Sequence, residues 1–132
     1  MPESLTDTVE RAYAALNRRD LDAFLGFAHE DVEVISLIAE SEGAVFHGHD
    51  GLRDWWHQVA GSMGELNFAN EGAQELDDEH VLIKLRVTGD VEGVEVEQLM
   101  WHAIEIRDEK GTWWQAFRTE EEGLEALRER AG

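Results

Sequence analysis

Residues 94–107 read VEVEQLMWHAIEIR, and apolar side chains recur at alternate positions along most of this stretch. A period of two is typical of a β-strand that presents one face to a core. The same period recurs in three further runs, FANEGAQEL (68–76), HVLIKLRVTG (80–89) and TWWQAF (112–117). Residues that favour turns separate the runs, at 77–79, 89–93 and 108–111. The second half of the chain therefore predicts an antiparallel meander.

The first half of the chain has helical spacing instead. Apolar residues recur every three or four positions in two segments, Leu5, Val9, Ala12, Tyr13 and Leu16, and Leu52, Trp55, Trp56, Val59 and Met63. A short helix is also expected after Asp20, which is a favourable N-cap. Between the helices, DVEVISLI (31–38) predicts a strand and AVFHG (44–48) a short extended segment.

The chain closes with TEEEGLEALRER (119–130), which predicts a terminal helix. Thr119 can cap this helix, and Glu122 completes a capping box three residues later. Helices followed by a long run of strands predict an α+β fold. We expect residues 1–132 to form a single domain, because the chain has the length of one ordinary domain and contains no visible linker or repeat.

Composition excludes several classes of partner. The formal net charge is -19, from 30 acidic and 11 basic residues, so a phosphate backbone would be repelled and we expect no nucleic-acid partner. The start, MPESLTDTVE, has no basic or apolar region, and no run approaches the roughly 18 apolar residues of a membrane span. The chain has no cysteine, which fits a reducing cytoplasm. We therefore expect a cytoplasmic protein without a membrane partner.

Three of the six histidines lie in FHGHDGLRDWWHQV (46–59), at His47, His49 and His57. A zinc site usually has tighter, paired ligand spacings, so this pattern indicates a helix start rather than a metal site. In that interpretation Gly48 turns the chain, and His49 or Asp50 caps the helix.

Three segments carry a resemblance to a known family: VERAYAALNRRDLDAFLGFAHEDVEV (9–34), FHGHDGLRDWW (46–56) and GVEVEQLMWHAIEIRDEKGTWWQAFRTEEEGLEAL (93–127). Together they resemble the SnoaL-like branch of the nuclear-transport-factor-2-like superfamily. The resemblance implies a cone, in which a curved, mostly antiparallel sheet wraps around N-terminal helices and encloses a central apolar pocket. It also implies a homodimer. The superfamily includes ketosteroid isomerases, polyketide cyclases, epoxide hydrolases, dehydratases and members without known activity, so function has to be argued from the site.

The best-known catalytic groups of the superfamily are absent from the matching positions. Alignment with ketosteroid isomerases puts Ala12 at their tyrosine, Ser36 at their aspartate base and His102 at their later acid. Tyr13 lies one residue beyond Ala12 and is turned by about 100° on the helix. Ala116 lies near the acid of cyclases and epoxide hydrolases. We therefore expect neither steroid isomerase nor epoxide hydrolase activity.

His102 is the candidate catalytic residue. Period two puts it on the same strand face as Gln98, Met100 and Ile104, which we assign to the pocket side. It is either a core histidine bonded to Ser36, Tyr13 or backbone, or a group that exchanges a proton or hydrogen bond with a carbonyl or hydroxyl compound. A second ionisable group nearby, for which His47 and Asp31 are candidates, would favour the catalytic role.

The remaining pocket residues are expected to bind a small apolar ligand without a cofactor or metal. They are Tyr13, Phe24, Ser36, Trp56, Val59, Met63, Gln98, Met100 and Trp114. On the opposite strand face, Leu99 and Trp101 predict a homodimer contact, or else a surface that the C-terminal helix covers.

Two functions fit this pattern. One is a cofactor-independent isomerase, dehydratase or cyclase that acts on a small apolar carbonyl or hydroxyl compound by proton transfer. The other is a non-catalytic small-molecule-binding protein with the same pocket.

Overall fold

The computed structural model describes residues 4–37 and 44–131. In these residues four helices and six strands follow one another in the predicted α+β order. The helices are α1 (Leu5–Asn17), α2 (Leu21–Leu25), α3 (Gly48–Ser62) and α4 (Glu120–Ala131). The strands are β1 (Ala28–Ile35), β2 (Val45–His47), β3 (Gly64–Glu75), β4 (His80–Val91), β5 (Val94–Arg107) and β6 (Lys110–Phe117).

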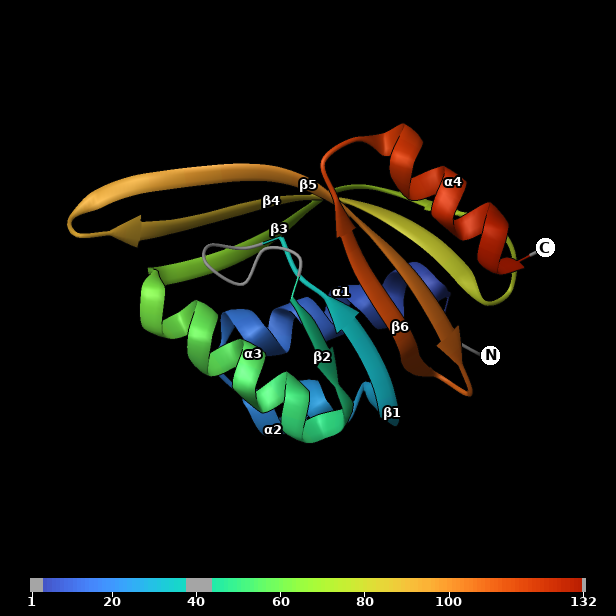
Figure 1. Cartoon of the computed structure of the whole chain (residues 1–132), viewed down its shortest axis with the longest axis horizontal. Helices are drawn as coiled ribbons and strands as arrows, with labels where there is room; N and C mark the ends of the chain where they lie inside the picture. The colour runs from blue at the N-terminus through green and yellow to red at the C-terminus, as the bar shows by residue number, and fades with distance from the viewer. Residues whose placement is uncertain (1–3, 38–43, 132) are drawn as a thin grey trace.

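One curved sheet holds all the described strands, in the order β2-β1-β6-β5-β4-β3. Neighbouring strands pair antiparallel except β1 and β6, which are parallel. Helices α1, α2 and α3 lie on one side of the sheet, and α4 lies on the other side (Figure 1). The predicted meander from β3 to β6 is confirmed, and the sheet wraps around the N-terminal helices as expected.

Two of the predicted helix caps are present. Asp20 Oδ1 accepts a hydrogen bond from the backbone N–H of Ala23 at 3.1 Å, at the start of α2. Thr119 Oγ1 accepts from the backbone N–H of Glu122 at 3.2 Å, at the start of α4. The Thr119 hydroxyl is also 3.0 Å from Glu122 Oε1. Each side chain satisfies a backbone donor that the helix itself leaves free.

The predicted cap of α3 is wrong. His47 occupies the N-cap position without a side-chain capping bond. Gly48 turns the chain with a φ of 72°, as expected. The His49 ring is 2.9 Å from the Ala28 carbonyl oxygen, and Asp50 pairs with Arg53 instead of capping. The ring of His49 therefore ties the helix start to β1, which local sequence could not reveal.

Strand β1 begins three residues earlier than predicted, at Ala28 instead of Asp31, and ends at Ile35. The early start follows from pairing, because Ala28 lies opposite Gly111 of β6 and the Gly111 N–H donates to the Phe27 carbonyl at 2.7 Å. The predicted end at Ile38 lies outside the described residues.

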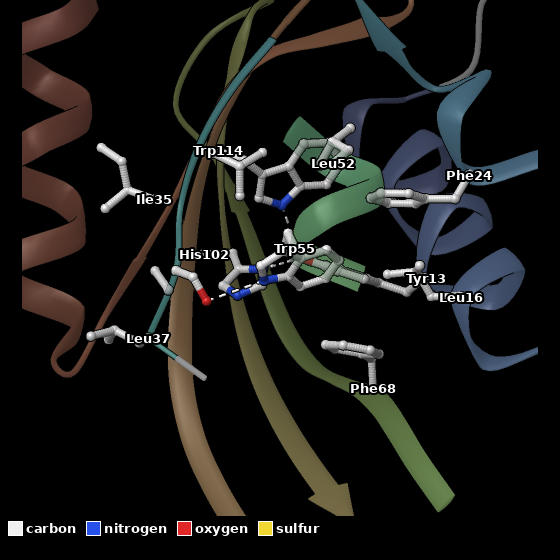
Figure 2. Close-up of a pocket in the computed structure, with 13 residues that line it drawn as sticks. Tyr13, Leu16, Phe24, Ile35, Leu37, Leu52, Trp55, Phe68, His102 and Trp114 are labelled. Carbon is white, nitrogen blue, oxygen red and sulfur yellow. Dashed lines mark hydrogen bonds between the residues drawn. The ribbon is translucent and has the colours of Figure 1, made fainter. Parts of the chain in front are cut away.

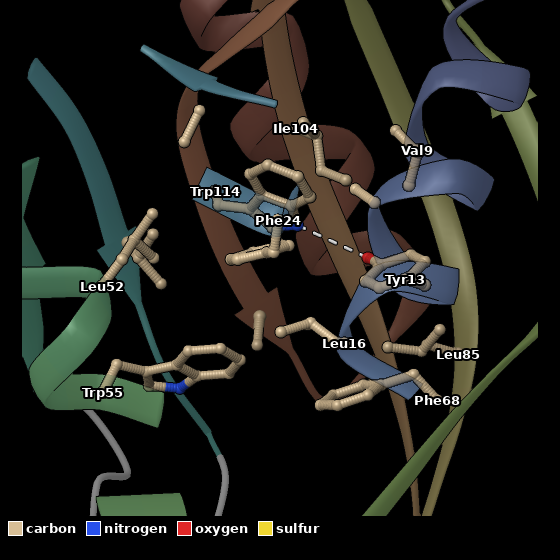
Figure 3. Close-up of a cluster of buried hydrophobic side chains, with 14 of the residues drawn as sticks. Val9, Tyr13, Leu16, Phe24, Leu52, Trp55, Phe68, Leu85, Ile104 and Trp114 are labelled. Carbon is tan, nitrogen blue, oxygen red and sulfur yellow. Dashed lines mark hydrogen bonds between the residues drawn. The ribbon is translucent and has the colours of Figure 1, made fainter. Parts of the chain in front are cut away.

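The main hydrophobic core fills the concave side of the sheet. Val9, Tyr13 and Leu16 of α1 point toward Ile104 and Trp114 of the sheet (Figure 3). All five are buried. The apolar stripe of α1 and the apolar face of the strands, both predicted from the sequence, therefore pack against each other.

A second, smaller core lies on the other face of the sheet, under α4. Its buried members are Leu82, Ala103, Trp113 and Leu127. A Cβ atom on Gly123 would lie 2.6 Å from Leu82 Cδ1, so glycine lets α4 approach the sheet this closely. The predicted opposite orientation of Trp113 and its neighbour on β6 is confirmed, and α4 covers Trp113.

None of the helices within residues 4–37 and 44–131 combines the length and the apolar character needed to cross a membrane.

Candidate functional site

A cavity lies between the concave face of the sheet and helices α1, α2 and α3 (Figure 2). Its volume is about 30 Å³. A site needs at least about 10–15 Å³ to hold one water, so the cavity has room for one or two molecules of that size. Much of its wall is aliphatic, from Leu16, Val34, Leu52 and Ala116.

Five aromatic side chains line the cavity and contact one another in a closed ring. Tyr13 stacks on Phe68 at 5.9 Å between ring centroids, and Phe68 is 6.4 Å from Trp55. Trp55 is 6.3 Å from Phe24, Phe24 is 5.9 Å from Trp114, and Trp114 is 6.3 Å from Tyr13. These spacings are those of attractive aromatic pairs. The five rings come from three helices (α1, α2 and α3) and two strands (β3 and β6) that are far apart in sequence, so only the fold assembles this arrangement.

Tyr13 and His102 form the polar centre of the cavity. Tyr13 Oη lies 2.6 Å from His102 Nδ1, and Trp114 Nε1 donates to Tyr13 Oη at 3.4 Å. The second ring nitrogen of His102, Nε2, lies 3.2 Å from the sulfur of Met100. Both Tyr13 and His102 are buried. The expectation that His102 is bonded to Tyr13, one of the alternatives from the sequence, is confirmed.

Burial keeps both polar side chains uncharged. It lowers the pKa of His102 from 6.5 to about 3, because no hydration compensates the imidazolium. Burial also raises the pKa of Tyr13 well above its usual value, although the hydrogen bond from Trp114 opposes this shift. At neutral pH the pair therefore offers hydrogen bonds without charge.

Charged side chains do not line the cavity in the part of the chain that the structure describes. Asp31 and His47 were candidates for a second ionisable group, but both are exposed and neither reaches the cavity wall. The backbone N–H of Asp31 donates to the ring of His29 instead. Adjacent positions on β1 and β2 alternate between faces, and these two fall on the outer one.

Five of the residues predicted for the site do line the cavity: Tyr13, Phe24, Ser36, His102 and Trp114. The Oγ atom of Ser36 accepts a hydrogen bond from Trp55 Nε1 at 3.1 Å. Tyr13, rather than Ala12, faces the cavity, so the alignment that put Ala12 at the tyrosine position does not describe which side chain points inward.

The other five predicted residues do not line the cavity. Trp56 points away from the cavity, because adjacent helix positions differ in direction by about 100°. The Cζ atom of Arg19 lies 5.8 Å from the centroid of the Trp56 ring. Val59 is part of the core, and Met63 packs at Gly89 on β4. Gln98 donates to the Leu37 carbonyl at 3.2 Å, and the Met100 side chain is fully buried beside His102.

Sequence reasoning missed Trp55 and Phe68, which supply two members of the aromatic ring. For Trp55 the signal was present, because the helical stripe contained both Trp55 and Trp56, but the prediction that Trp56 lines the pocket is wrong. Phe68 lies on a strand whose burial changes along its length, and nothing local marked it as a cavity residue.

Metal ligation finds no support in the geometry. Among the described side chains, no group of three or more His, Asp and Glu is placed to share an ion. His47 and His57 are exposed, and His49 is bonded to backbone.

Comparison with known proteins shows the family of the chain. Residues 9–116 match the family described as the SnoaL-like domain. The chain belongs to this family. No curated protein matches the chain.

Solved structures show the same fold as this SnoaL-like chain. A crystal structure of TerC co-crystallised with polyporic acid has a TM-score of 0.75 and 20% identity, and covers 95% of this chain and 98% of its own. A protein with a ketosteroid isomerase-like fold from Catenulispora acidiphila, in complex with trimethylamine, has a TM-score of 0.74 and 17% identity, and the match covers 92% of each chain. A candidate polyketide cyclase from Xanthomonas campestris has a TM-score of 0.74 and 20% identity, and covers 93% of this chain and 96% of its own.

Proposed function

We propose that this protein binds a small, mostly apolar compound in the cavity between the sheet and helices α1 to α3. The observation that carries the proposal is the uncharged Tyr13–His102 pair at the centre of an aromatic and aliphatic wall. Small-molecule sites commonly combine such walls with a few placed polar groups. His102 is the residue that we expect to bond an oxygen of the ligand.

The size of the cavity limits the ligand. At about 30 Å³ it is much smaller than the cavity of about 150 Å³ that holds benzene in an engineered protein. One or two non-hydrogen atoms fit as the walls stand, and a compound of the size of acetone requires wall side chains to move. Two of the similar proteins were crystallised with organic molecules, polyporic acid and trimethylamine. These complexes support a binding role for the fold.

Acetone is a suitable probe, because it has four non-hydrogen atoms and one oxygen that accepts hydrogen bonds. We expect acetone to shift the indole N–H signals of Trp55 and Trp114 in ¹H–¹⁵N NMR spectra. His102→Phe removes a hydrogen bond worth about 1 kcal/mol, so the dissociation constant should rise about fivefold to tenfold. His57→Phe on the exposed side of α3 is the control. Equal affinity of wild type and His102→Phe would contradict the assignment of His102.

Proton-transfer catalysis is the second candidate. The similarity of this chain to the candidate polyketide cyclase from Xanthomonas campestris supports it. The Tyr13–His102 pair argues against it, because the pKa of His102 is about 3 and that of Tyr13 is raised, far from the values near neutrality that suit a general acid or base. Turnover of a simple enone by wild type, abolished in His102→Phe, would establish the catalytic role instead.

The outer face of the sheet is the proposed homodimer contact. Helix α4 covers only part of this face. Leu99 is 37% exposed, and Trp101 is half-buried against the core under α4. Trp101 also borders a groove with Lys84 of β4 and Glu120 of α4. Aromatic residues of this kind are common at the centres of protein–protein interfaces.

A further inference from the structure

We infer that Tyr13 and Trp114 position His102: their hydrogen bonds hold its imidazole in the tautomer with the proton on Nε2, so that the cavity presents a hydrogen-bond donor to its ligand. Tyr13 is then a positioning residue rather than the group that recognises the ligand. The tautomer is a property of the free protein, whereas the consequence for the ligand rests on the binding function proposed above.

The direction of the hydrogen bonds begins at Trp114. An indole N–H donates and cannot accept, so the 3.4 Å contact between Trp114 Nε1 and Tyr13 Oη makes the tyrosine oxygen the acceptor. The hydroxyl hydrogen of Tyr13 remains free to be donated elsewhere. Tyr13 keeps this hydrogen at neutral pH, because burial raises its pKa.

The acceptor for that hydrogen is His102 Nδ1. It lies 2.6 Å from Tyr13 Oη, a short distance for a neutral hydrogen bond. A neutral imidazole has one protonated and one bare nitrogen, and the bare nitrogen must be the acceptor. Because burial holds His102 in its neutral form, its single proton is on Nε2.

The Nε2–H group faces a weak partner in the protein itself. Met100 Sδ lies 3.2 Å away, and a thioether sulfur is a poor acceptor. An oxygen atom of a ligand is a better acceptor than this sulfur. Met100 is not part of the cavity wall, whereas His102 is.

The consequence is selectivity for a ligand that accepts hydrogen bonds but does not donate them. A carbonyl oxygen satisfies Nε2–H and brings no further hydrogen. A hydroxyl group brings a hydrogen that needs an acceptor. The wall hydroxyl oxygens, Tyr13 Oη and Ser36 Oγ, each already accept one hydrogen bond, from Trp114 and Trp55, so only one further lone pair on each is left for that hydrogen. Burial of a donor without a partner costs about 1–3 kcal/mol. A ketone should therefore bind about tenfold more tightly than the alcohol of the same shape.

The first test measures the tautomer in the free protein. Long-range ¹H–¹⁵N spectra distinguish protonated from bare ring nitrogens, and His102→Gln identifies the His102 signals by their loss. We expect a protonated Nε2 and a bare Nδ1 in wild type, unchanged between pH 6 and pH 8 and retained in the control Trp55→Phe. In Tyr13→Phe we expect signals of mixed tautomers, with circular dichroism showing the same helix content. A proton on Nδ1 in wild type would overturn the inference, and an unmixed Nε2–H tautomer in Tyr13→Phe would overturn the role of Tyr13.

The second test compares acetone with propan-2-ol and 2-methylpropene, which have the same number of non-hydrogen atoms and nearly the same shape. Wild type should bind acetone about tenfold more tightly than propan-2-ol, and Tyr13→Phe should reduce this ratio. A preference for propan-2-ol, or equal binding of acetone and 2-methylpropene, would overturn the inference while leaving the binding function intact. Failure of all three probes to bind would overturn the binding function and leave the tautomer result standing.

Discussion

Protonation of His102 in the cavity changes the stability of the fold. Its pKa is about 3 in the folded protein and near 6.5 in the unfolded chain. The unfolded chain therefore binds more protons between these values, and stability falls as the pH falls from about 6.5 toward about 3. Above pH 6.5 both states hold His102 neutral, and its contribution does not vary with pH.

Replacement of His102 should therefore flatten the pH dependence of folding. Between pH 7 and pH 5 the wild-type free energy of unfolding should decrease by about 2 kcal/mol through His102 alone, because each unit of pKa difference is worth about 1.4 kcal/mol. His102→Phe should lose this part of the decrease in urea unfolding measured at both pH values. His57→Phe, at an exposed position, should behave as wild type. An identical slope in wild type and His102→Phe would show that His102 is not held neutral by burial.

At the scale of single residues, the sequence predicted the position of His102 correctly, but Gln98 and Met100, which were predicted for the same strand face, do not line the cavity. Alternation along 94–107 put His102 on the pocket face, because a strand has only two faces. A helical stripe is broader, so the choice between Trp55 and Trp56, and between Ala12 and Tyr13, depended on how each helix is rotated against the sheet. That rotation is set by packing between segments far apart in the chain.

Among the structural elements, α4 is attached to the sheet by a buried carboxylate as well as by apolar contacts. Glu105 of β5 accepts from Thr112 Oγ1 at 2.8 Å, and lies 3.0 Å from His80 Nε2 and 3.4 Å from Arg130 Nη2 of α4. Burial raises the pKa of Glu105, but the hydrogen bonds from Thr112, Arg130 and His80 outweigh burial and hold it below its usual value. The ring of His80 also contacts Asp77 of the β3–β4 turn, at 2.8 Å.

Glu105→Gln should weaken this attachment. It removes the charge that Arg130 and His80 share, and we expect a loss of about 1–3 kcal/mol in the free energy of unfolding at pH 7. The pKa of Glu105 is lower in the folded state, so its contribution is present above the unfolded value of about 4.5 and is lost as the pH falls through the folded value. The difference between variant and wild type should therefore shrink below about pH 4 in urea titrations.

Glu71→Gln is the matched control for this carboxylate. Glu71 pairs with Arg86 on the solvent side of the sheet, where water and salt screen the interaction. The control should change stability much less than Glu105→Gln. An equal effect of the two variants would show that the buried network does not hold α4.

Sequence patterns identified the elements but not all of their neighbours. The turns between β3 and β6 predicted the meander, because short connections join antiparallel neighbours. The parallel pairing of β1 with β6 joins the first strand of the chain to the last strand of the meander, and no local signal marks it. This pairing also makes β1 begin three residues before its predicted start. The ends of a strand therefore depend on its neighbours as well as on its own sequence.

For the whole molecule, net charge and the exposed outer face act in opposite directions. Two chains of charge -19 repel each other, and salt screens this repulsion. The outer face around the exposed Leu99 and the half-buried Trp101 favours association by burial of apolar surface. We therefore expect a homodimer whose dissociation constant falls as the salt concentration rises.

Trp101→Glu should convert this dimer to a monomer, because it puts a charge at the centre of the apolar contact. Light scattering at fixed protein concentration measures the mass directly. Val94→Glu, at a position that is 63% exposed at the end of the β4–β5 hairpin, should leave the dimer intact. A monomeric wild type, or a dimeric Trp101→Glu, would rule out this interface.

The central claim is that the cavity itself holds the ligand, and intermolecular nuclear Overhauser effects test it most directly. The methyl protons of acetone should show these effects to the rings of Phe24, Phe68 and Trp114, which surround the space next to His102 (Figure 2). Effects confined to surface residues such as Leu99 and Val94, or none at saturating acetone, would contradict the account.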